Sequence, residues 1–581
     1  MKSSSEKRNI KRSNLLEFGA ALLIIIFVNL IGHYLFGRLD LTAEKRYTLA
    51  KATKKMLKEV DEPVLFRIYL EGDFPSEYKH LQNETREMLN QFRAYNKNIE
   101  YEFVNPNAIE DQQEKRVFYQ KLAEKGIQPA FIQVQTQDGM MQQILIPAAD
   151  VMYKGRETSI QLLNNQAYVS EEVALNNSIQ DLEYVLSNAI RNLSRAVKPK
   201  IGFLLGHGEL ERGSVYDIQM ALAENYRMEN VYLNNNINVL TGRNRSAKDS
   251  AMHFFNKFDV LVVAKPTQAF NDQELYILDQ YVMYGGSVLW LIDPLNADLD
   301  SLAEQPQTIA LRNQTNLDEM LFVYGARVNP DIIMDIRCRP IPMTVGMVGD
   351  KPQIKFCPWY YFPELVPTSN HPIVRNLDLI KTDFVSSIDL IDNDIEKTVL
   401  LSTSQFCRVK NAPAIIDMND GKVEPDRRLF NKSNLPVAVL LEGNFKSMWR
   451  GRLAPSFTEL PEMGFRDTSE RTRMIVISDG DMIKNRFDYK DNAGYPLGYD
   501  YYTRTMYANK QFLLNAIDYL AGNEESLATR SRDVRLRKTN AMLIKEHRTS
   551  YQVTNVMLPV VCVLIGGAIY LIIRRKTVKK K

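Results

Sequence analysis

Two long uncharged segments, one close to each end of the chain, constrain this sequence more than any other feature. No charged residue occurs from Phe18 to Gly37, and the second uncharged run lies between Arg548 and Arg574. Each is long enough to cross roughly 30 Å of hydrocarbon as a helix. We therefore predict transmembrane helices at residues 15–37 and 551–573, with a large water-exposed body between them.

A cleaved signal peptide is the alternative interpretation of the first segment, because five basic residues precede it as in a basic n-region. The apolar region is longer than that of a signal peptide, and Gly37-Arg38-Leu39 is a poor small-x-small cleavage site. We therefore expect an uncleaved anchor.

The positions of lysine and arginine predict the orientation, because cytoplasmic flanks of membrane helices carry the excess of positive charge. Basic residues precede the first segment and six follow the second, so we expect the tails, residues 1–14 and 574–581, to be cytoplasmic. The body would then lie across the membrane. A formal net charge of +3 is too small to favour nucleic acid as a partner.

The four cysteines predict neither a disulfide framework nor a zinc site. Cys562 lies in the second apolar segment, and Cys338, Cys357 and Cys407 form no CxxC pair. At most one disulfide is expected among these three.

The first part of the body, residues 38–165, has the pattern of a small α/β domain. Strands are expected at 64–70, 99–104, 130–134 and 143–146, with helices between the first three, an order that is thioredoxin-like. Asp138-Gly139 is expected to turn the last two strands into a hairpin. The region has no redox cysteines, so this order implies no redox function. A helix within residues 166–198 is expected to link it to the next domain.

Residues 199–522 alternate between buried strands and helices, which predicts a mainly parallel sheet with helices on both faces. One helix, from Asp272 to Tyr284, has Asn271 and Glu274 placed for a capping box and Gly285-Gly286 to end it. Residues 295–473 are proline-rich and irregular, so we expect excursions from the same sheet. The aromatic run at 357–363 is expected to be buried. A return segment, 523–550, leads to the second helix.

Gly206-His207-Gly208-Glu209 is the best candidate for a ligand or partner contact, because it follows the first strand of the parallel sheet. Ligands of such folds bind at the carboxyl ends of strands, and His207 and Glu209 could act as base, ligand or hydrogen-bonding pair. The structural alternative is that the glycines form the turn and the polar pair bonds to neighbouring loops.

Asp479-Gly480-Asp481 is the second candidate, because carboxylates on a loop after a strand could hold a divalent cation. It is shorter than a calcium-loop signature, and Asx-turn and cap chemistry is the simpler explanation. Asp293-Pro294, after the preceding parallel strand, has the same two interpretations. No metal site or cofactor is predicted from either.

Signatures of catalysis are missing from the sequence. It has no Gly-x-Ser-x-Gly nucleophile elbow and no Gly-x-x-x-x-Gly-Lys-Ser/Thr phosphate loop. Any ATP used by this system must therefore be hydrolysed by another chain.

Several motifs together resemble the GldG proteins of Bacteroidetes, and the resemblance covers nearly the whole chain. They are Arg38 to Leu49, Gly206-His207-Gly208-Glu209, Gln280-Tyr281-Val282 with Gly285-Gly286-Ser287, Asp293-Pro294, His371-Pro372-Ile373-Val374, Asp479-Gly480-Asp481 and Asn515 to Leu520. The resemblance implies a gliding-motility-associated ABC transporter component in the bacterial inner membrane, called substrate-binding or auxiliary, with its body in the periplasm. It also implies a permease and a separate cytoplasmic ATPase as partners, and a second domain similar to glutamine-amidotransferase-like α/β folds without a catalytic set.

The leading hypothesis is therefore a non-enzymatic auxiliary subunit, whose partners also include the lipid bilayer and periplasmic cargo or envelope proteins. The segment just outside the first helix is expected to couple the membrane part to the body, through Arg38, Asp40, Thr42, Arg46 and Tyr47. Two other hypotheses stay open: a scaffold linking the membrane to envelope machinery, and a membrane-tethered hydrolase that uses His207 and Glu209.

Overall fold

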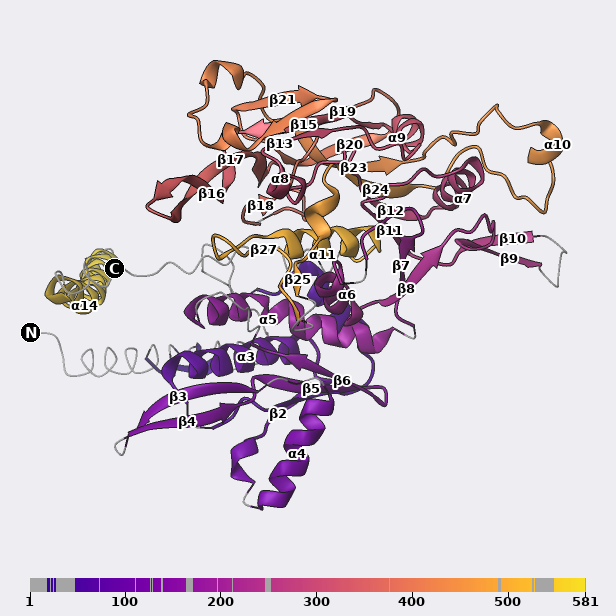
Figure 1. Ribbon diagram of the computed structural model, residues 1–581. Coiled ribbons are helices and arrows are strands. Elements are labelled where there is room, and N and C mark those ends of the chain that lie inside the picture. The colour runs from indigo at the N-terminus through magenta and orange to yellow at the C-terminus, as the bar shows by residue number, and fades with distance from the viewer. Residues whose placement is uncertain are drawn as a thin grey trace, which may run out of the picture. The chain divides into compact units, whose positions relative to one another are not determined.

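The structure is a computed structural model, and it divides the chain into two compact units that are described separately. The described residues are 18–20, 22–24, 26–27, 48–72, 74–109, 111–125, 127, 129–136, 139–163, 171–195, 197–211, 213–245, 252–375, 377–488, 493–524, 527 and 548–579 (Figure 1). The larger unit holds a four-stranded sheet, a ten-stranded sheet and several two-stranded sheets. The smaller unit comprises residues 41–46 and 533–581.

The first sheet of the larger unit has four strands in the order β2-β1-β5-β6. β1 is parallel to β2 and antiparallel to β5, and β5 is antiparallel to β6. The elements of this region are α2 (Lys51–Glu59), β1 (Val64–Ile68), α3 (Ser76–Tyr95), β2 (Ile99–Phe103), η1 (Pro106–Ala108), α4 (Gln112–Glu124), β3 (Ala130–Thr136), β4 (Gly139–Leu145), β5 (Ala148–Tyr153), β6 (Arg156–Gln161) and α5 (Glu171–Ser194).

The helix predicted within residues 166–198 is α5, and it packs into the core of the first sheet. Leu182 and Leu186 of α5 lie in one buried cluster with Phe66 of β1, Val151 of β5 and Phe92 of α3. These apolar residues recur at helical spacing in α3 and α5, so one face of each helix is removed from water. α5, which follows the first sheet in the chain, therefore supplies a large part of the hydrophobic core of that sheet.

The predicted hairpin at 130–146 forms, but as a separate two-stranded ribbon of β3 and β4 rather than as part of the first sheet. The sheet takes its hairpin from β5 and β6, which the sequence analysis missed. β5 is buried on almost every residue, so it lacks the alternation that marks a half-exposed strand. The turn, Lys154-Gly155, has positive φ at both residues, as two-residue hairpin turns require.

The large sheet has ten strands, with the path β16-β17-β20-β23-β24-β12-β11-β7-β8 and β18 paired to β17. Five consecutive strands of this path, from β24 to β8, are mutually parallel. Their bounds are β7 (Lys200–Leu205), β8 (Arg227–Tyr232), β11 (Val260–Ala264), β12 (Ser287–Leu291) and β24 (Thr472–Ile477). Numbered along the chain, these five strands follow the doubly wound order 2-1-3-4-5, whose switch point lies between β7 and β11.

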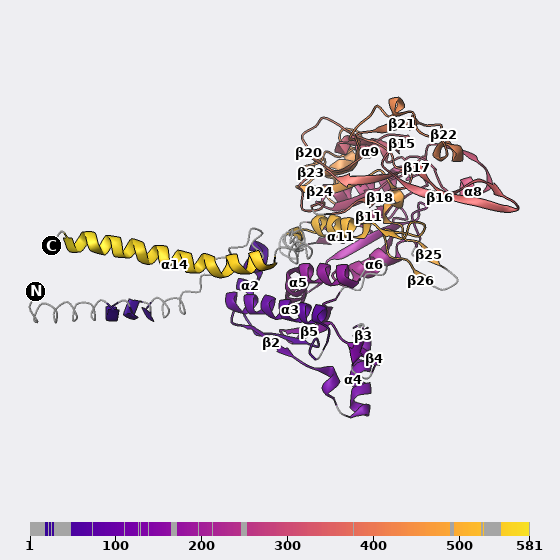
Figure 2. The ribbon, with the colours of Figure 1, turned by 90° about the vertical axis from the view of Figure 1, so that its left-hand side faces the viewer.

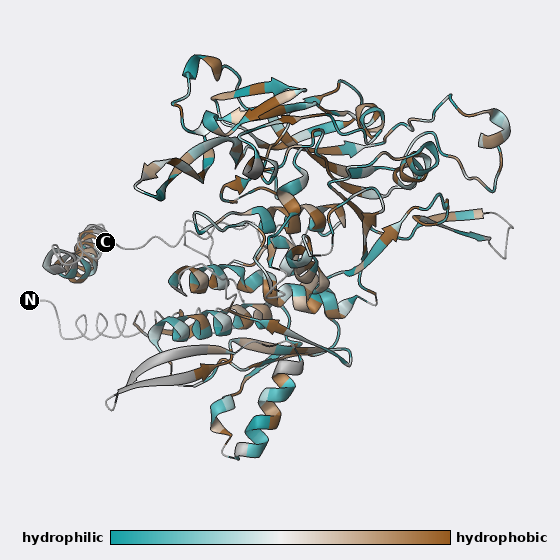
Figure 3. Cartoon of the chain, viewed as in Figure 1, coloured by the Kyte–Doolittle hydropathy of each residue, from teal (hydrophilic) through white to brown (hydrophobic). Residues whose placement is uncertain are grey.

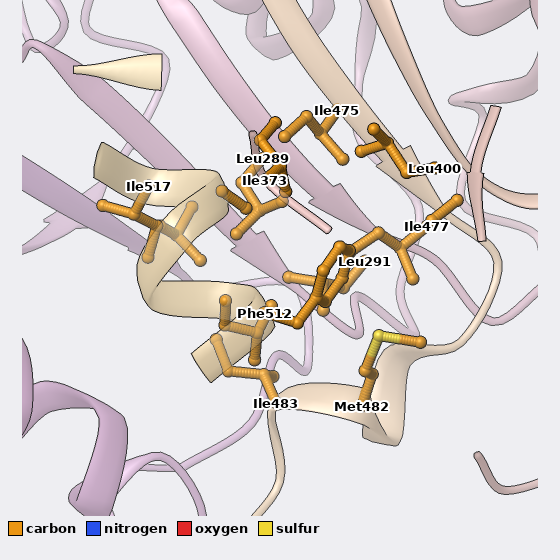
Figure 4. Packing of buried hydrophobic residues seen from close by; sticks show 14 of the residues in the cluster. Leu289, Leu291, Ile373, Leu400, Ile475, Ile477, Met482, Ile483, Phe512 and Ile517 are labelled. Carbon is orange, nitrogen blue, oxygen red and sulfur yellow. The ribbon is translucent and has the colours of Figure 1, made fainter. Parts of the chain in front are cut away.

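Helices cover both faces of the parallel strands, as the alternating pattern predicted. α6 (Tyr216–Ala223) and α11 (Asn509–Leu520) contribute to one buried cluster, while α7 (Asp272–Met283) and α9 (Asp318–Tyr324) contribute to the other. Leu289 and Leu291 of β12 point toward Phe512 of α11 (Figure 4), whereas Trp290 between them belongs to the opposite cluster. The central strands β11, β12 and β24 are therefore hydrophobic along nearly their whole length (Figure 3).

Residues 295–473 contain many strands, so the expectation of an irregular region was too coarse. They extend the sheet with antiparallel strands and add small two-stranded sheets. The prolines of this region are the reason that its strands were not predicted, because proline within a sequence is normally taken as evidence against a strand. The strands that extend the sheet are β16 (Cys338–Val348), β17 (Lys351–Pro367), β18 (Ile380–Lys381), β20 (Glu396–Ser402) and β23 (Pro436–Gly443).

The remaining strands of the larger unit form small two-stranded sheets. The aromatic run predicted to be buried belongs to β17, and Trp359 and Tyr361 are fully buried there. Cys338, Cys357, Cys407 and Cys562 are free thiols. The remaining elements are β9 (Thr241–Arg245) with β10 (Met252–Asn256), β13 (Gln307–Ala310) with β22 (Ala414–Asp417), β14 (Ala326–Val328) with β19 (Ile388–Leu390), β15 (Asp331–Asp335) with β21 (Cys407–Asn411), β25 (Phe487–Asp488) with β26 (Ala493–Gly494), β27 (Tyr499–Asp500) with β28 (Thr505–Met506), α8 (Ser301–Glu304), α10 (Pro455–Thr458), η2 (Met418–Gly421), η3 (Arg427–Leu429) and η4 (Gly480–Ile483).

The smaller unit is described through α14, a single helix from Arg548 to Lys579 (Figure 2). Its segment Gln552–Ile572 is long and apolar enough to cross a membrane, judged by length and composition. Of the first predicted span, residues 18–20, 22–24 and 26–27 are described and helical, and the other residues lie outside the described part.

Candidate functional site

Four loops at the carboxyl edge of the parallel strands carry three polar residues that the sequence singled out and a lysine that it did not. They follow β7, β11, β12 and β24 and bring His207, Lys265, Asp293 and Asp479 to the same edge of the sheet. Doubly wound sheets bind their ligands at this edge. The geometry of these side chains therefore decides what the edge can do.

Lys265 is the centre of the first cluster, which we call the lysine cluster. It is the first residue after β11, and its Nζ lies 3.1 Å from Asp293 Oδ2 and 2.5 Å from Asp481 Oδ2. Its φ of 57° is in the left-handed region that non-glycine residues rarely adopt. The two ion pairs hold Lys265 in this conformation, and they join the loops that follow three neighbouring strands.

Asp479, which follows β24 on the same edge, is fully buried and accepts hydrogen bonds from two backbone amides. Asp481 N donates to Oδ1 at 2.8 Å, which caps η4, and Asp383 N donates to Oδ2 at 3.1 Å. Gly480 N donates to Asp293 Oδ1. A Cβ on Gly480 would lie 2.7 Å from Lys265 Cβ, so only glycine fits between the two aspartates.

Burial sets the protonation of the lysine cluster. It raises the pKa of Asp293 to about 6, against the attraction of Lys265. Burial and the neighbouring carboxylates of Asp293 and Asp481 raise the pKa of Asp479 well above its usual range. Burial alone would lower the pKa of Lys265, but its two aspartate partners raise it by more. At neutral pH the lysine is therefore an ion-paired ammonium and no nucleophile, while burial disfavours the charged form of Asp479.

His207 is the centre of a second cluster, the histidine cluster, in the loop after β7. Nε2 lies 3.0 Å from Glu274 Oε2 at the start of α7, and the ring stacks on Phe270 with centroids 3.8 Å apart. Nδ1 lies 3.3 Å from Glu209 Oε1, but the angle is not that of a hydrogen bond. Glu209 instead accepts a 2.6 Å bond from the backbone N–H of His207.

The two glutamates determine the charge of His207. Burial lowers the pKa of the imidazole, but Glu209 and Glu274 raise it by more, so it lies above its ordinary value. A general base needs a free imidazole nitrogen that faces a substrate. The buried ring instead directs one nitrogen at each glutamate, an arrangement that favours an ion-paired imidazolium.

Backbone hydrogen bonds close the switch point between β7 and β11. Thr267 N and Gln268 N both donate to His207 O at 2.8 Å, so the two loops are tied together. Gly208 has a φ of +75°, and a Cβ there would lie 2.1 Å from Thr267 Oγ1. The loops therefore fill the crevice in which a doubly wound fold would hold a ligand.

A further charged group lies beside the lysine cluster and was not found from the sequence. Arg339 of β16 is buried and forms ion pairs with Asp383 and Asp500. Asp383 also contacts Asp479 through its backbone amide, so Arg339 is linked to the carboxyl edge. Glu274, which the sequence placed only in a helix cap, proves to serve both the cap and His207.

A pocket of about 300 Å³ lies next to Asp293. Ile292 and Pro294, on either side of that residue, line it together with residues of α9 such as Phe322. Its lining is mostly apolar and comes from residues 292–330. In the histidine cluster and in the lysine cluster, by contrast, charged groups pair with one another inside the cluster.

Residues 198–516, more than half of the chain, match the family described as "ABC-type uncharacterized transport system", a family of auxiliary components. The chain belongs to this family. Membership makes it an auxiliary component of an ABC-type transport system, and permease and ATPase subunits are the general partners of such a component. The apolar helix α14 agrees with association of this component with a membrane.

Other similarities extend beyond the family's matched region. Residues 43–152 match a domain of unknown function, DUF7088. An uncharacterized protein of Borreliella burgdorferi is 20% identical over 582 residues, which covers 97% of this chain and 98% of that protein. A solved structure titled "mmIFT52 N-terminal domain" is 15% identical with a TM-score of 0.29, covering 55% of this chain and 96% of that one.

Within the family region, two more of the motifs contact each other on the opposite side of the sheet from α7. Asn515 of α11 donates from Nδ2 to Ile373 O at 2.9 Å, and the His371 ring meets Tyr519 edge-on at 4.8 Å. These residues fasten α11 to the loop before β18. The proposed coupling residues Arg38, Asp40, Thr42, Arg46 and Tyr47 lie outside the described residues.

Proposed function

We propose that this protein is a non-enzymatic subunit that passes conformational change between the membrane part of an ABC transporter and an extracytoplasmic body. The proposal rests on the ion pairs and hydrogen bonds at the carboxyl edge of the parallel strands. Its lysine and histidine are held in ion pairs, and its loops are bonded to each other where a substrate would enter. Paired side chains and closed loops of this kind fit a structural role in a rigid body better than a catalytic role.

Several finer points belong to the same proposal. Both termini are cytoplasmic, since basic residues flank both apolar segments, and the body is periplasmic in the bacterial inner membrane. The resemblance to GldG proteins supports an association with gliding motility. The histidine loop and Asp479-Gly480-Asp481 are then contacts that shape a partner-binding surface rather than catalytic groups.

The connection between the coupling segment and the body has support in the first described residues after it. Leu49 is buried in the core of the first sheet, and Ala50 N donates to Glu183 Oε1 of α5 at 2.7 Å. A displacement that arrives along residues 38–47 would therefore be delivered to α5. This makes α5 the element through which movement at the membrane reaches the body.

Gentle solubilisation of the full chain from its native membrane, followed by co-purification, tests the function. We expect stoichiometric recovery of a permease and an ATPase. Alanine at Asp40, Arg46 and Tyr47 should keep the subunits together but uncouple transport, and intact transport would refute the coupling role. Recovery of envelope or motor proteins alone would favour the scaffold hypothesis instead.

The hydrolase hypothesis has its own test in the same preparation. His207→Ala and Glu209→Ala would abolish function with normal assembly if these residues were catalytic. We expect instead that any loss of function follows a loss of stability or assembly, because both side chains are buried, His207 pairs with Glu274 of α7 and Glu209 accepts from the backbone of its own loop.

A further inference from the structure

A long two-stranded ribbon projects from the large sheet, formed by β16 and the first part of β17 (Figures 1 and 2). β17 pairs with β18 and β20 only through residues 364–367, so among the described strands its residues 351–363 pair with β16 alone. We call residues 340–358 the ribbon. Its two faces differ strongly in chemistry.

One face of the ribbon is an almost continuous apolar stripe. Cross-strand partners share a face, and this face holds the pairs Pro340–Pro358, Pro342–Phe356, Thr344–Ile354 and Met347–Pro352. Ile354 is 64% exposed, Met347 63% and Phe356 51%. The partners on the opposite face, such as Ile341 and Cys357, are buried near the base of the ribbon.

An irregularity in the ribbon completes this stripe. The register shifts between Thr344 and Gly346, where Val345 is the extra residue of a bulge. Without it, strict alternation would place Met347 on the face of Met343, away from Ile354. The bulge therefore adds a third large apolar side chain to the exposed face.

The open edge of β16 is unsuited to pairing with another strand. Pro340 and Pro358 face each other and have no N–H to exchange, so theirs is a non-hydrogen-bonded position. The nitrogens of Pro340 and Pro342 then face the open edge, where both lack a donor. A partner must therefore bind the apolar face by side-chain contact.

The face is too small to hold two copies of the chain together by itself. It spans about 20 Å along the strands and about 10 Å across them, several-fold less than the ~800 Å² per partner of a stable interface. A groove that encloses the stripe and both edges of the ribbon would bury more surface area than a contact with the flat face alone. Prolines at four positions stiffen the ribbon, so little conformational entropy is lost on insertion.

The charges near the tip indicate the chemistry of such a groove. Lys351 and Lys355 are exposed, have no carboxylate partner among the described residues and do not lie on the apolar face. Together with the exposed Asp350 of the turn, they leave the ribbon with a net positive charge. Acidic residues on the rim of the groove would pair with them. We propose that the ribbon inserts its apolar stripe into an apolar groove with an acidic rim on the permease of the same transport system.

This inference rests on the proposed function, and the following experiment separates the two. The full chain is expressed with its permease and ATPase, with a photoreactive benzoylphenylalanine at Ile354 or Met347. We expect light to give a covalent adduct with the permease. The same probe at Gln353, which lies at the tip on the other face, should give several-fold less adduct.

Ile354→Asp provides a second measurement. It should lower permease recovery about tenfold, because a carboxylate would be buried in an apolar groove. Ile415→Asp is the matched control, since Ile415 is a 55% exposed isoleucine of β22. Lys351→Glu with Lys355→Glu should weaken recovery in the same direction, through repulsion from the acidic rim.

The outcomes are distinct. If the wild-type chain recovers no permease, the proposed function fails and the docking proposal fails with it. If the permease is recovered but Ile354 and Met347 give adducts with a second copy of the chain, with lipid or with nothing, the docking proposal alone is overturned. Equal effects of Ile354→Asp and Ile415→Asp would overturn it as well.

Discussion

Lys265 shows at the scale of one residue how the carboxyl edge is stabilised. A buried charge is tolerated only when it is paired, and the carboxylates of Asp293 and Asp481 meet this ammonium from two neighbouring loops. The lysine in turn is the cation that both of these buried carboxylates share. Its removal should therefore cost much more than removal of an exposed lysine.

We predict that Lys265→Met lowers the free energy of unfolding of the full chain by about 3 to 5 kcal/mol at pH 7, because it leaves buried carboxylates without their cation. The loss should be smaller at pH 5, where Asp293, with a pKa of about 6, is protonated. Urea unfolding at both pH values measures this. Lys446→Met, in an exposed ion pair, should change stability by no more than about 0.5 kcal/mol, and an equal effect of both would refute the argument.

His207 makes a pH-dependent contribution of predictable sign. Its pKa in the folded protein is raised, so the stabilisation is fully present below the unfolded value of about 6.5 and is lost as the pH rises through the folded pKa. The stability difference between wild type and His207→Gln should thus be largest near pH 6 and shrink toward pH 9. Chemical unfolding of both proteins across this range measures it, and a difference that grows with pH would contradict it.

At the scale of elements, turns between strands and helices decide how closely the loops of the carboxyl edge can approach. α7 has the capping box predicted for it, with Asn271 accepting from Gln273 N and Glu274 N. The same Glu274 reaches His207, so the cap of one helix also fixes the loop after β7. Gly208 in that loop has both a left-handed conformation and a close neighbour.

The variants Gly208→Ala and Gly451→Ala separate the cost of the left-handed backbone conformation from the cost of the steric contact with a neighbour. Both glycines have positive φ, so both substitutions should cost about 1 kcal/mol of backbone strain. Only Gly208 has a neighbour in the way, Thr267 Oγ1 at 2.1 Å from the added Cβ, which should add about 1 to 3 kcal/mol. Thermal unfolding of the two variants measures the difference, and equal losses would show that the loop relaxes freely.

For the whole molecule, the decisive question is on which side of the membrane each part lies. The six basic residues after Ile573 predict a cytoplasmic end for α14. A green fluorescent protein fused after Lys581 should therefore fluoresce, whereas alkaline phosphatase at the same point should be inactive. Replacement of all six basic residues by glutamine should reduce the fraction in this orientation, and an active phosphatase on the wild-type chain would refute it.

Much of this protein follows from local signals in its sequence. The apolar run that becomes α14, the buried strands β7, β11, β12 and β24, and the cap of α7 each depend on neighbouring residues alone, so hydropathy and spacing predict them. The hairpin β5–β6 was not predicted, because β5 is buried on almost every residue and so lacks the alternating pattern of a half-exposed strand. The ribbon β16–β17 was not predicted, because its prolines interrupt that pattern.

The tertiary structure alone decided the partners at the carboxyl edge. His207 meets Glu274 across 67 residues of sequence, and Lys265 meets Asp481 across 216. No local pattern links residues so far apart, since only the order of strands in the sheet brings their loops together. The sequence by itself determined where the polar groups lie along the chain, and the fold determined that they neutralise one another.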